Sequence, residues 1–589
     1  MYNDSSVIQH KAADELKHYL QSIFKISPKI IKKENLQKNG LYFFLGKGFL
    51  ADSLNITDTL PKDAFVKAFH NRNIYLGGDD DLDLNSVKYG FFKPVENHNF
   101  GTLYAVYDFL ENNLGVHWFF PTYLGEFVPD NKEYSFGEEI QVTVPAFTER
   151  AFGIEYLSYN KDTAMIWMIR NKTELSNIKL YNHNWRKLVP PSVYFDSLPG
   201  LFAEVNEKRR TYNNPNKYAQ LCTTNEDLVR LFVDNARQYL KTHPGEKYLS
   251  LSPNDNRKFC ECENCIKQDT CVNISPAYSR LSNRIFTFYQ RVADSIWKDY
   301  PDLELGGFAY YQFAAPPCNL KLSDNFHVRL AINNIGFYSK KNLKMDTLTS
   351  LIKNWKNKNN NLGFNSWPYS GRWAYPIIST DNYRILITTL YQNNFKQAKF
   401  TFLPEWYAQG LDIWLITKML WKPDVDIDSL KEIYYQAVYP KSNEIIRNFH
   451  TVLQNRVDTL DIFQWKYTST IERLRDIYMK LYDESFLRET KFKIENALKD
   501  KKVTGKEREN LLNMKNLFDF LILEYDAYST YRQMKLLPGK QARNDFEKSI
   551  SLLRKSPGLA YHSAYFDPSK SPSLFISNRG ILKILKHVW

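Results

Sequence analysis

Residues 247–256 read Lys-Tyr-Leu-Ser-Leu-Ser-Pro-Asn-Asp-Asn, and this stretch decides the fold. A short apolar run bounded by Pro and Asn is typical of a buried strand that ends in a polar loop. Residues 226–240 and 278–297 on either side carry apolar side chains at helical spacing, and residues 303–311 form a second apolar run. A strand, a helix and another strand indicate a βαβ unit, in which the two strands are parallel.

The same alternation continues in both directions along the chain. Four further apolar runs predict strands at residues 151–157, 327–332, 363–367 and 399–403. Six strands of this kind predict a TIM-like (β/α)8 barrel over residues 146–440, with one or two irregular strands that periodicity does not reveal.

The two ends of the chain have different patterns. Residues 1–145 combine helical and strand signals, which predicts a small N-terminal α/β domain. Residues 441–589 lack strand signals and carry helical periodicity with many charges, which predicts a C-terminal helical region. The clearest segments are helices at 12–20 and 101–110, strands at 41–46 and 74–78, and C-terminal helices at 471–487, 507–528 and 542–553.

Composition places the chain among folded proteins. Its 589 residues are 43% hydrophobic and 24% charged, enough for several domains. No apolar run approaches the roughly 20 residues that span a bilayer, so we expect no membrane span. The net charge is +13 and the pI about 9.0, but no basic run reaches five residues. We therefore expect a solvated basic surface and no nucleic-acid partner.

The first six residues have neither a charged segment nor an apolar segment of the kind that directs export. Two localisations stay open: the cytoplasm, or the periplasm or extracellular space if a leader was removed.

Four of the six cysteines cluster at Cys260, Cys262, Cys265 and Cys271. The spacing C-x-C-x2-C-x5-C can place four thiolates around a structural Zn²⁺, because short loops allow neighbouring cysteines to converge. A disulfide and unliganded thiols are the alternatives. No histidine lies nearby to complete a catalytic metal site, and no other cofactor is expected.

Two carboxylates follow predicted strands directly, where a parallel barrel carries its functional groups. Asp255 follows the strand at 247–251 and Glu405 follows the strand at 399–403, while Glu155 is a weaker third candidate. Glycoside hydrolysis requires one protonated and one ionised carboxyl group, so the pair Asp255 and Glu405 fits that reaction. The structural alternatives are an Asx turn or helix cap for Asp255 and a salt-bridged loop carboxylate for Glu405.

Aromatic and polar side chains gather near the same strand ends. Flat aromatic faces suit sugar rings, and polar groups suit their hydroxyls, although core packing or a structural histidine are the alternatives. The candidate substrate-binding residues are His183, Asn184, Trp185, Asn254, Tyr310, Tyr311, Trp367, Trp373, Tyr375 and Trp406. The chain has no P-loop, no H-E-x-x-H, no G-x-S-x-G and no dinucleotide-binding motif.

At these residues the chain resembles known carbohydrate-active families. Residues 101–107, Gly-Thr-Leu-Tyr-Ala-Val-Tyr, through 114–118, Leu-Gly-Val-His-Trp, resemble the domain that precedes the barrel in α-glucuronidases and β-hexosaminidases. The middle of the chain resembles the formerly unknown-function domain of glycoside hydrolase family 163. The shared motifs are His-Asn-Trp at 183–185, Leu-Cys-Thr at 221–223, Ser-Pro-Asn-Asp at 252–255, the cysteine block at 260–265 and Leu-Trp-Lys-Pro-Asp-Val-Asp at 420–426.

The resemblance implies a retaining β-N-acetylglucosaminidase acting on complex N-glycans, with Asp255 and Glu405 in the two carboxyl roles. In related hexosaminidases the acetamido group of the substrate is the nucleophile, one carboxyl group is the acid and another orients the amide. The sequence departs from the family at Asn256, where a glycine is usual after Asn-Asp. The alternatives are an α-glucuronidase acting on uronic-acid-bearing polysaccharide, and a non-catalytic glycan-binding protein.

Overall fold

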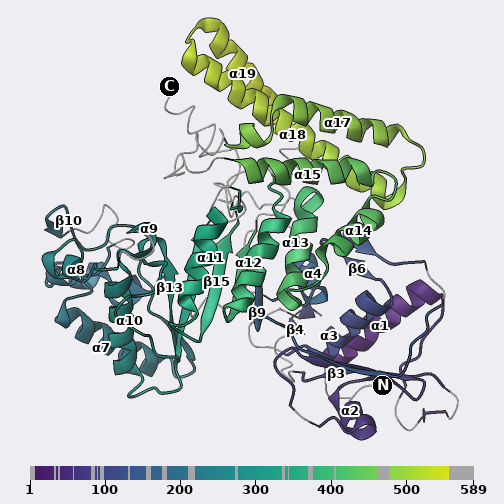
Figure 1. Cartoon of the computed structure of the whole chain (residues 1–589), viewed down its shortest axis with the longest axis horizontal. Helices are drawn as coiled ribbons and strands as arrows, with labels where there is room; N and C mark the ends of the chain where they lie inside the picture. Colours follow the sequence, from purple (N-terminus) through teal and green to yellow (C-terminus); the bar gives the residue numbers. More distant parts are fainter. Residues whose placement is uncertain are drawn as a thin grey trace.

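The computed structural model contains three groups of elements: an N-terminal sheet with its helices, a central parallel sheet with its helices, and a set of C-terminal helices (Figure 1). It describes residues 7–31, 35–37, 40–57, 59–80, 87–88, 91–92, 99–130, 133–153, 161–174, 182–209, 219–271, 276–333, 338–341, 344–368, 376–402, 406–460 and 477–555.

The N-terminal sheet has four strands in the order β1-β3-β2-β8. Alternation along β2 divides its side chains between two cores: Phe65 and Phe69 pack on the side of α1 and α3, whereas Val66 and Ala68 pack on the side of α2. Both faces are thus covered, and the helices and strands predicted up to residue 110 are present. Their bounds are α1 (Val7–Phe24), β1 (Phe43–Leu45), α2 (Lys47–Leu54), β2 (Phe65–His70), β3 (Asn73–Gly78), α3 (Gly101–Asp108) and β8 (Glu139–Thr143).

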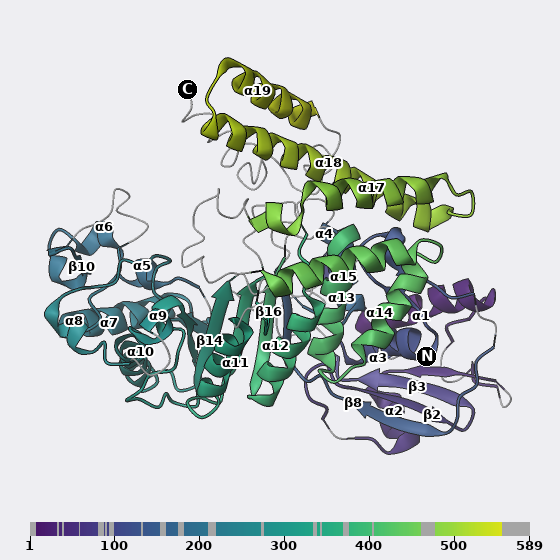
Figure 2. The same ribbon diagram turned by 45° about the horizontal axis from the view of Figure 1, so that its top comes forward.

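The central sheet has six strands in the order β12-β13-β14-β15-β16-β9, and every neighbouring pair is parallel. The parallel α/β prediction is therefore confirmed, and each of the six predicted strands is found. Helices α11 and α12 pack along this sheet (Figure 2). The strands are β9 (Glu149–Gly153), β12 (Tyr248–Ser250), β13 (Glu304–Tyr310), β14 (Phe326–Asn333), β15 (Leu362–Trp367) and β16 (Phe395–Thr401); the accompanying helices are α4 (Lys161–Arg170), α7 (Glu226–Thr242), α10 (Ser282–Ile296), α11 (Lys344–Trp355), α12 (Thr380–Gln392) and α13 (Trp406–Trp421).

Two isolated parallel bridges extend the edges of this sheet. Glu174 pairs with Ala151 beside β9, and His183 pairs with Ser252 just beyond β12. Residues 175–181 between these bridges lie outside the described part of the chain. The described residues thus form a curved sheet of six parallel strands, and closure into a barrel of eight stays a prediction.

The described residues of the last part of the chain are mainly helical, as their periodicity predicted, although the predicted helix at 471–487 is interrupted before Glu484 and begins outside the described residues. The long helix α18 packs against α17 and α19, and the helices lie above the central sheet in Figure 1. Their bounds are α14 (Ile427–Val438), α15 (Asn443–Thr459), α17 (Glu484–Lys499), α18 (Gly505–Leu536) and α19 (Lys540–Lys555).

A buried histidine in α15 makes the stability of the fold sensitive to acid. His450 lies 2.9 Å from the Tyr435 hydroxyl and 3.0 Å from the Ala408 carbonyl, and burial lowers its pKa to about 4. An unfolded histidine titrates near 6.5, so the folded state binds fewer protons below that pH. We expect this residue to remove roughly 2 kcal/mol of stability between pH 6.5 and 5. Urea unfolding of wild type and His450→Gln over this range measures the effect, and equal slopes would contradict it.

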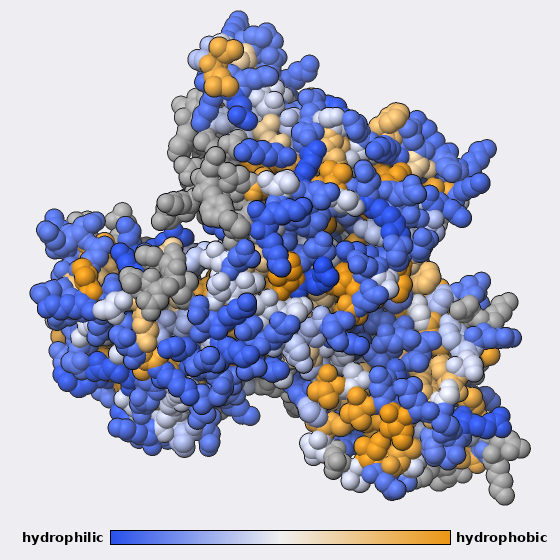
Figure 3. Space-filling model, viewed as in Figure 1, coloured by the Kyte–Doolittle hydropathy of each residue, from blue (hydrophilic) through white to orange (hydrophobic). Residues whose placement is uncertain are grey.

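The visible face of the molecule is mostly hydrophilic, with apolar side chains gathered over the N-terminal sheet (Figure 3). Within the described residues, no helix is both long enough and apolar enough to cross a bilayer.

Candidate active site

One face of the central sheet is concave and carries a buried ion pair that shows which side chains point inward. Arg329 of β14 donates to Glu149 of β9 at 3.0 Å and to Gln397 of β16 at 3.1 Å, although β15 lies between them. Gly363 of β15 is in register with Arg329 and Gln397, and a Cβ atom there would lie 3.2 Å from Arg329 Nε. The three long side chains therefore cross over this glycine on the inner face.

Two further rows of inward side chains follow toward the carboxyl ends of the strands, because side chains two residues apart share a face. The first row contains Asn365 and Lys399, which are in register and both buried. Asn365 Oδ1 has no hydrogen-bond partner among the described residues. The last row contains Asn333 and Trp367, which are in register and partly or fully exposed. The inner face thus becomes polar and accessible at the end where a parallel barrel binds its substrate.

Asp255 lies at this same end, in the loop after β12. Its side chain is exposed, and no described residue donates a hydrogen bond to its carboxylate. The backbone around it is held by Gln220, whose Nε2 donates to the Asn254 carbonyl at 2.6 Å and to the Asn256 carbonyl at 3.1 Å. The loop therefore presents an exposed carboxylate on a fixed backbone.

Asn256, where the resemblance described above led us to expect glycine, fits this loop without strain. Its backbone does not adopt a positive φ, and its Oδ1 accepts a hydrogen bond from the Lys258 amide at 2.9 Å. The Asx turn that was an alternative reading of Asp255 is thus made by Asn256.

His183 and Tyr310 lie beside the Asp255 loop. His183 Nδ1 is 2.5 Å from the Pro253 carbonyl, which can only accept, so Nδ1 carries the hydrogen of this bond. The His183 and Tyr310 rings are 5.9 Å apart, and the Tyr310 hydroxyl donates to the Asn254 carbonyl at 3.3 Å. Burial raises the pKa of Tyr310 well above its usual value, and the negative charge of Asp255 raises it further. Tyr310 is therefore a neutral hydrogen-bond donor next to the Asp255 carboxylate.

Several predicted site residues are buried and make structural contacts. Trp185 is fully buried and donates to the Leu251 carbonyl at 2.6 Å, and Trp406 is buried against Trp167 with ring centroids 5.0 Å apart. Asn254 is buried, and its side chain bonds the Ala219 carbonyl and the Arg186 amide. These buried side chains support the loops, and their role in substrate binding stays a prediction.

The other predicted residues divide into two groups. Asn184 is almost buried at the start of the short helix α5 (Trp185–Leu188), and Tyr311 is half-buried beneath the Arg257 guanidinium at 4.3 Å. Outside the described residues lie Glu155, Trp373, Tyr375 and Glu405. The pairing of Asp255 with Glu405 therefore stays a prediction.

The predicted set of four clustered cysteines is wrong in one member. Cys271 forms a disulfide with Cys318, whereas Cys222 joins Cys260, Cys262 and Cys265, with all four sulfur atoms within 4.8 Å of one another. Local spacing had favoured Cys271, but the chain brings in a cysteine from an earlier segment.

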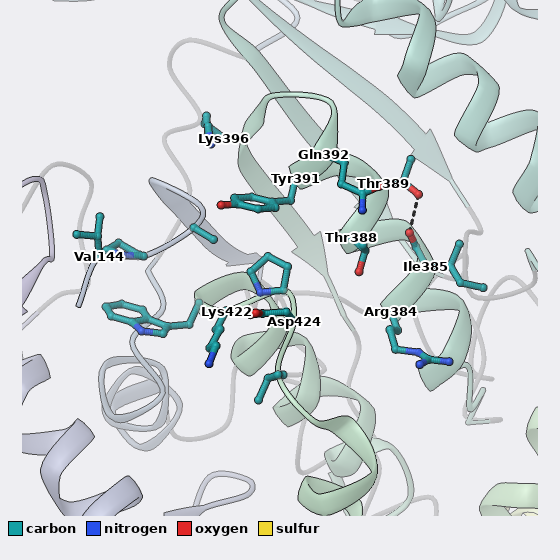
Figure 4. A pocket seen from close by; sticks show the side chains of 15 residues that line it. Val144, Arg384, Ile385, Thr388, Thr389, Tyr391, Gln392, Lys396, Lys422 and Asp424 are labelled. Atoms are coloured by element: carbon teal, nitrogen blue, oxygen red, sulfur yellow. Dashed lines mark hydrogen bonds between the residues drawn. The ribbon is translucent and has the colours of Figure 1, made fainter. Parts of the chain in front are cut away.

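A cavity of about 980 Å³ lies at the opposite end of the sheet, near the amino ends of β9 and β16 (Figure 4). Lys396 and Tyr391 line one side of it, and Lys422 and Asp424 line another. The motif at residues 420–426 contributes to its wall. In parallel barrels the amino ends of the strands serve stability, and chemistry takes place at the carboxyl ends. We therefore place the candidate active site at the Asp255 end.

Comparison with known proteins adds a family and a set of distant structural similarities. Residues 120–451 match a family model described as Domain of unknown function (DUF4838). No curated protein sequence matches the chain. A family 89 glycoside hydrolase from Clostridium perfringens, solved with GlcNAc-α-1,4-galactose, is 11% identical with a TM-score of 0.48, covering 94% of this chain and 65% of that chain. This chain thus spans about two thirds of the length of that enzyme.

Two further structures are similar at the same low level. One is a protein described as CpGH84B, at 11% identity and a TM-score of 0.39, covering 100% of this chain and 95% of that chain. Another is a GH138 enzyme targeting pectin rhamnogalacturonan II, at 10% identity and a TM-score of 0.37, covering 96% of this chain and 73% of that chain. Identities this low do not transfer a substrate from one chain to another.

Proposed function

The chain belongs to the DUF4838 family, and from the geometry of its inner face we propose that it is a glycoside hydrolase. The observation that carries this proposal is Asp255: a fixed loop presents its exposed carboxylate beside Tyr310, at the polar end of the sheet. Amide side chains and a tryptophan at one open end suit the hydroxyls and the C–H faces of a sugar. Glu405, four residues after the end of β16, would supply the second carboxyl group.

The substrate we propose is a β-linked N-acetylglucosamine residue in a complex N-glycan, cleaved with retention of configuration. The acetamido oxygen of the sugar attacks the anomeric carbon as the bond to the leaving oxygen breaks. One carboxyl group of the pair Asp255 and Glu405 protonates the leaving oxygen, and the other orients the acetamido N–H. Water then opens the cyclic intermediate and returns a proton to the acid. The family resemblance of residues 252–255 and 260–265 supports this choice of sugar.

Lys399 favours a second candidate, an α-glucuronidase. Its buried side chain lies on the inner face, one row before the last, and a uronic acid requires a cation for its carboxylate. An N-acetylglucosamine residue is neutral and has no such requirement.

The test is incubation of the purified protein with complex N-glycans and with nitrophenyl β-N-acetylglucosaminide and α-glucuronide, followed by mass analysis of every product. We expect release of N-acetylglucosamine-terminated glycan and, by NMR, a first product that keeps the β configuration. Release of glucuronic acid alone would replace the first candidate with the second. Glycan binding in calorimetry without any product would contradict both and favour a glycan-binding protein.

A further inference from the structure

Four cysteines from two segments meet beneath the Asp255 loop. Cys222 lies two residues after Gln220, which holds the loop. Cys260 and Cys262 lie between the loop and the short helix α8 (Glu263–Lys267), and Cys265 lies within α8. Cys222 Sγ is 3.6 Å from Cys262 Sγ and 3.8 Å from Cys265 Sγ. Cys222, Cys260 and Cys265 are buried, Cys262 is partly exposed, and none of the four forms a disulfide.

These distances match a metal site and differ from a disulfide. Two sulfurs bonded to each other are about 2.05 Å apart. Four thiolates around Zn²⁺ have Zn–S bonds of about 2.3 Å, which places neighbouring sulfurs about 3.8 Å apart at tetrahedral angles. Both measured separations from Cys222 fall close to this value. Thiols are weak hydrogen-bond donors, so four of them in one cluster gain little from one another without a cation.

The groups around the cluster also suit thiolates. The Glu204 amide donates to Cys260 Sγ at 3.3 Å, and the Thr224 hydroxyl lies 3.2 Å from Cys265 Sγ, where it can donate to an ionised sulfur. Donors of this kind orient metal-bound sulfur and spread its negative charge. The buried Arg284 guanidinium donates to the Cys260 carbonyl at 2.6 Å, which places a cation near the cluster.

We propose that Cys222, Cys260, Cys262 and Cys265 together bind one Zn²⁺ ion. All four ligands come from the protein, which leaves no position open for water, so the ion has a structural role. Soft sulfur donors in a tetrahedral set favour zinc over calcium, magnesium and manganese.

The position of this site gives the ion a specific task. Gln220, two residues before Cys222, holds the carbonyls of Asn254 and Asn256 on both sides of Asp255. The Asp255 loop continues to Cys260. An ion bound by both Cys222 and Cys260 therefore links the segment that contains Gln220 to the end of the Asp255 loop. Zinc would therefore fix the backbone that presents Asp255. This last step rests on the proposed function, whereas metal binding itself does not.

Metal analysis of the purified full chain tests the site. We expect one zinc per chain by mass spectrometry, in a form that a chelator removes only after the thiols are modified. Replacement by Co²⁺ should give the thiolate charge-transfer bands and the intense d–d bands of a tetrahedral cobalt–sulfur site. A wild-type chain that stays free of zinc after incubation with zinc chloride, and whose four thiols react at once, would overturn the proposal.

Two variants separate this site from the set suggested by spacing alone. Cys222→Ser should lose most of the zinc, whereas the matched double variant Cys271→Ser/Cys318→Ser, which removes only the disulfide, should keep one zinc per chain. The reverse result would overturn the assignment of Cys222. If a variant fails to fold, the cobalt spectrum of wild type still decides the number of sulfur ligands. Zinc in the wild-type chain together with no glycosidase activity would contradict the proposed function and leave the metal site in place.

Discussion

Asp255→Asn and Glu405→Gln will each lower kcat/KM on an N-glycan substrate by about 10²- to 10⁴-fold, the range that a positioned acid or base contributes. Asp255 has no hydrogen-bond partner among the described residues, and its exposed side chain leaves the packing of the loop to Gln220 and Asn254. The substitution should therefore remove chemistry with little change in stability. Steady-state kinetics with matched thermal melts would measure both effects.

The leaving group distinguishes the two carboxyl roles. A general acid is needed most for a poor leaving group such as a sugar hydroxyl, and least for a dinitrophenolate. The variant whose defect shrinks on a dinitrophenyl substrate has lost the acid, and the variant whose defect persists has lost the group that orients the acetamide. The sequence left these roles open, and this measurement assigns them.

Asp424→Asn is the matched control for these variants. Asp424 is also an exposed aspartate, but it lines the cavity at the amino end of the sheet. We expect this variant to keep wild-type turnover. If Asp424→Asn abolishes turnover while both other variants retain it, the active site lies at the opposite end of the sheet from the one proposed.

Periodicity predicted the strands and helices, but it did not predict which side chains lie on the inner face of the central sheet. Each of the six parallel strands was visible as a mainly apolar run, because strands covered on both faces are rich in apolar side chains. Which residues point inward depends on the register between neighbouring strands, and a shift of one residue reverses every side chain. Lys399 and Asn365 were missed for this reason. Polar residues inside otherwise apolar strands, Arg329, Asn365 and Lys399, were the signals in the sequence that could have suggested a polar interior.

The sequence predicted site residues whose position follows from the end of a strand. It missed, or placed wrongly, residues whose position depends on tertiary packing. Asp255 lies in the loop after β12, so its position was readable. Trp185 was predicted as a substrate-binding residue because it lies in an aromatic and polar segment of the sequence. In the structure its side chain is buried in the core and donates a hydrogen bond to the Leu251 carbonyl. Cys222 lies 40 residues before Cys262, a separation at which spacing in the sequence says nothing about distance in space.

Arg150→Met will destabilise the protein by about 3–5 kcal/mol, the cost of leaving a buried charge without its partner. Glu149 and Arg150 are adjacent in β9 and point to opposite faces: Glu149 binds Arg329 on the inner face, and Arg150 binds Asp63 of the N-terminal part at 2.6 Å. Arg150 is 0% exposed and Asp63 is 2% exposed. Arg150 also donates to the carbonyls of Lys172 and Phe147 at 2.8 and 2.6 Å, and these acceptors would lose their donor as well.

Urea unfolding of three variants tests this reasoning. Arg230→Met is the matched control, because Arg230 pairs with Asp227 at the surface with side chains 70% and 72% exposed, and such pairs contribute about 1 kcal/mol or less. The double variant Arg150→Met/Asp63→Asn should be more stable than Arg150→Met alone, since the unpaired carboxylate is then removed. A midpoint shift for Arg150→Met no larger than that of Arg230→Met would mean that this ion pair does not hold the N-terminal part against the central sheet.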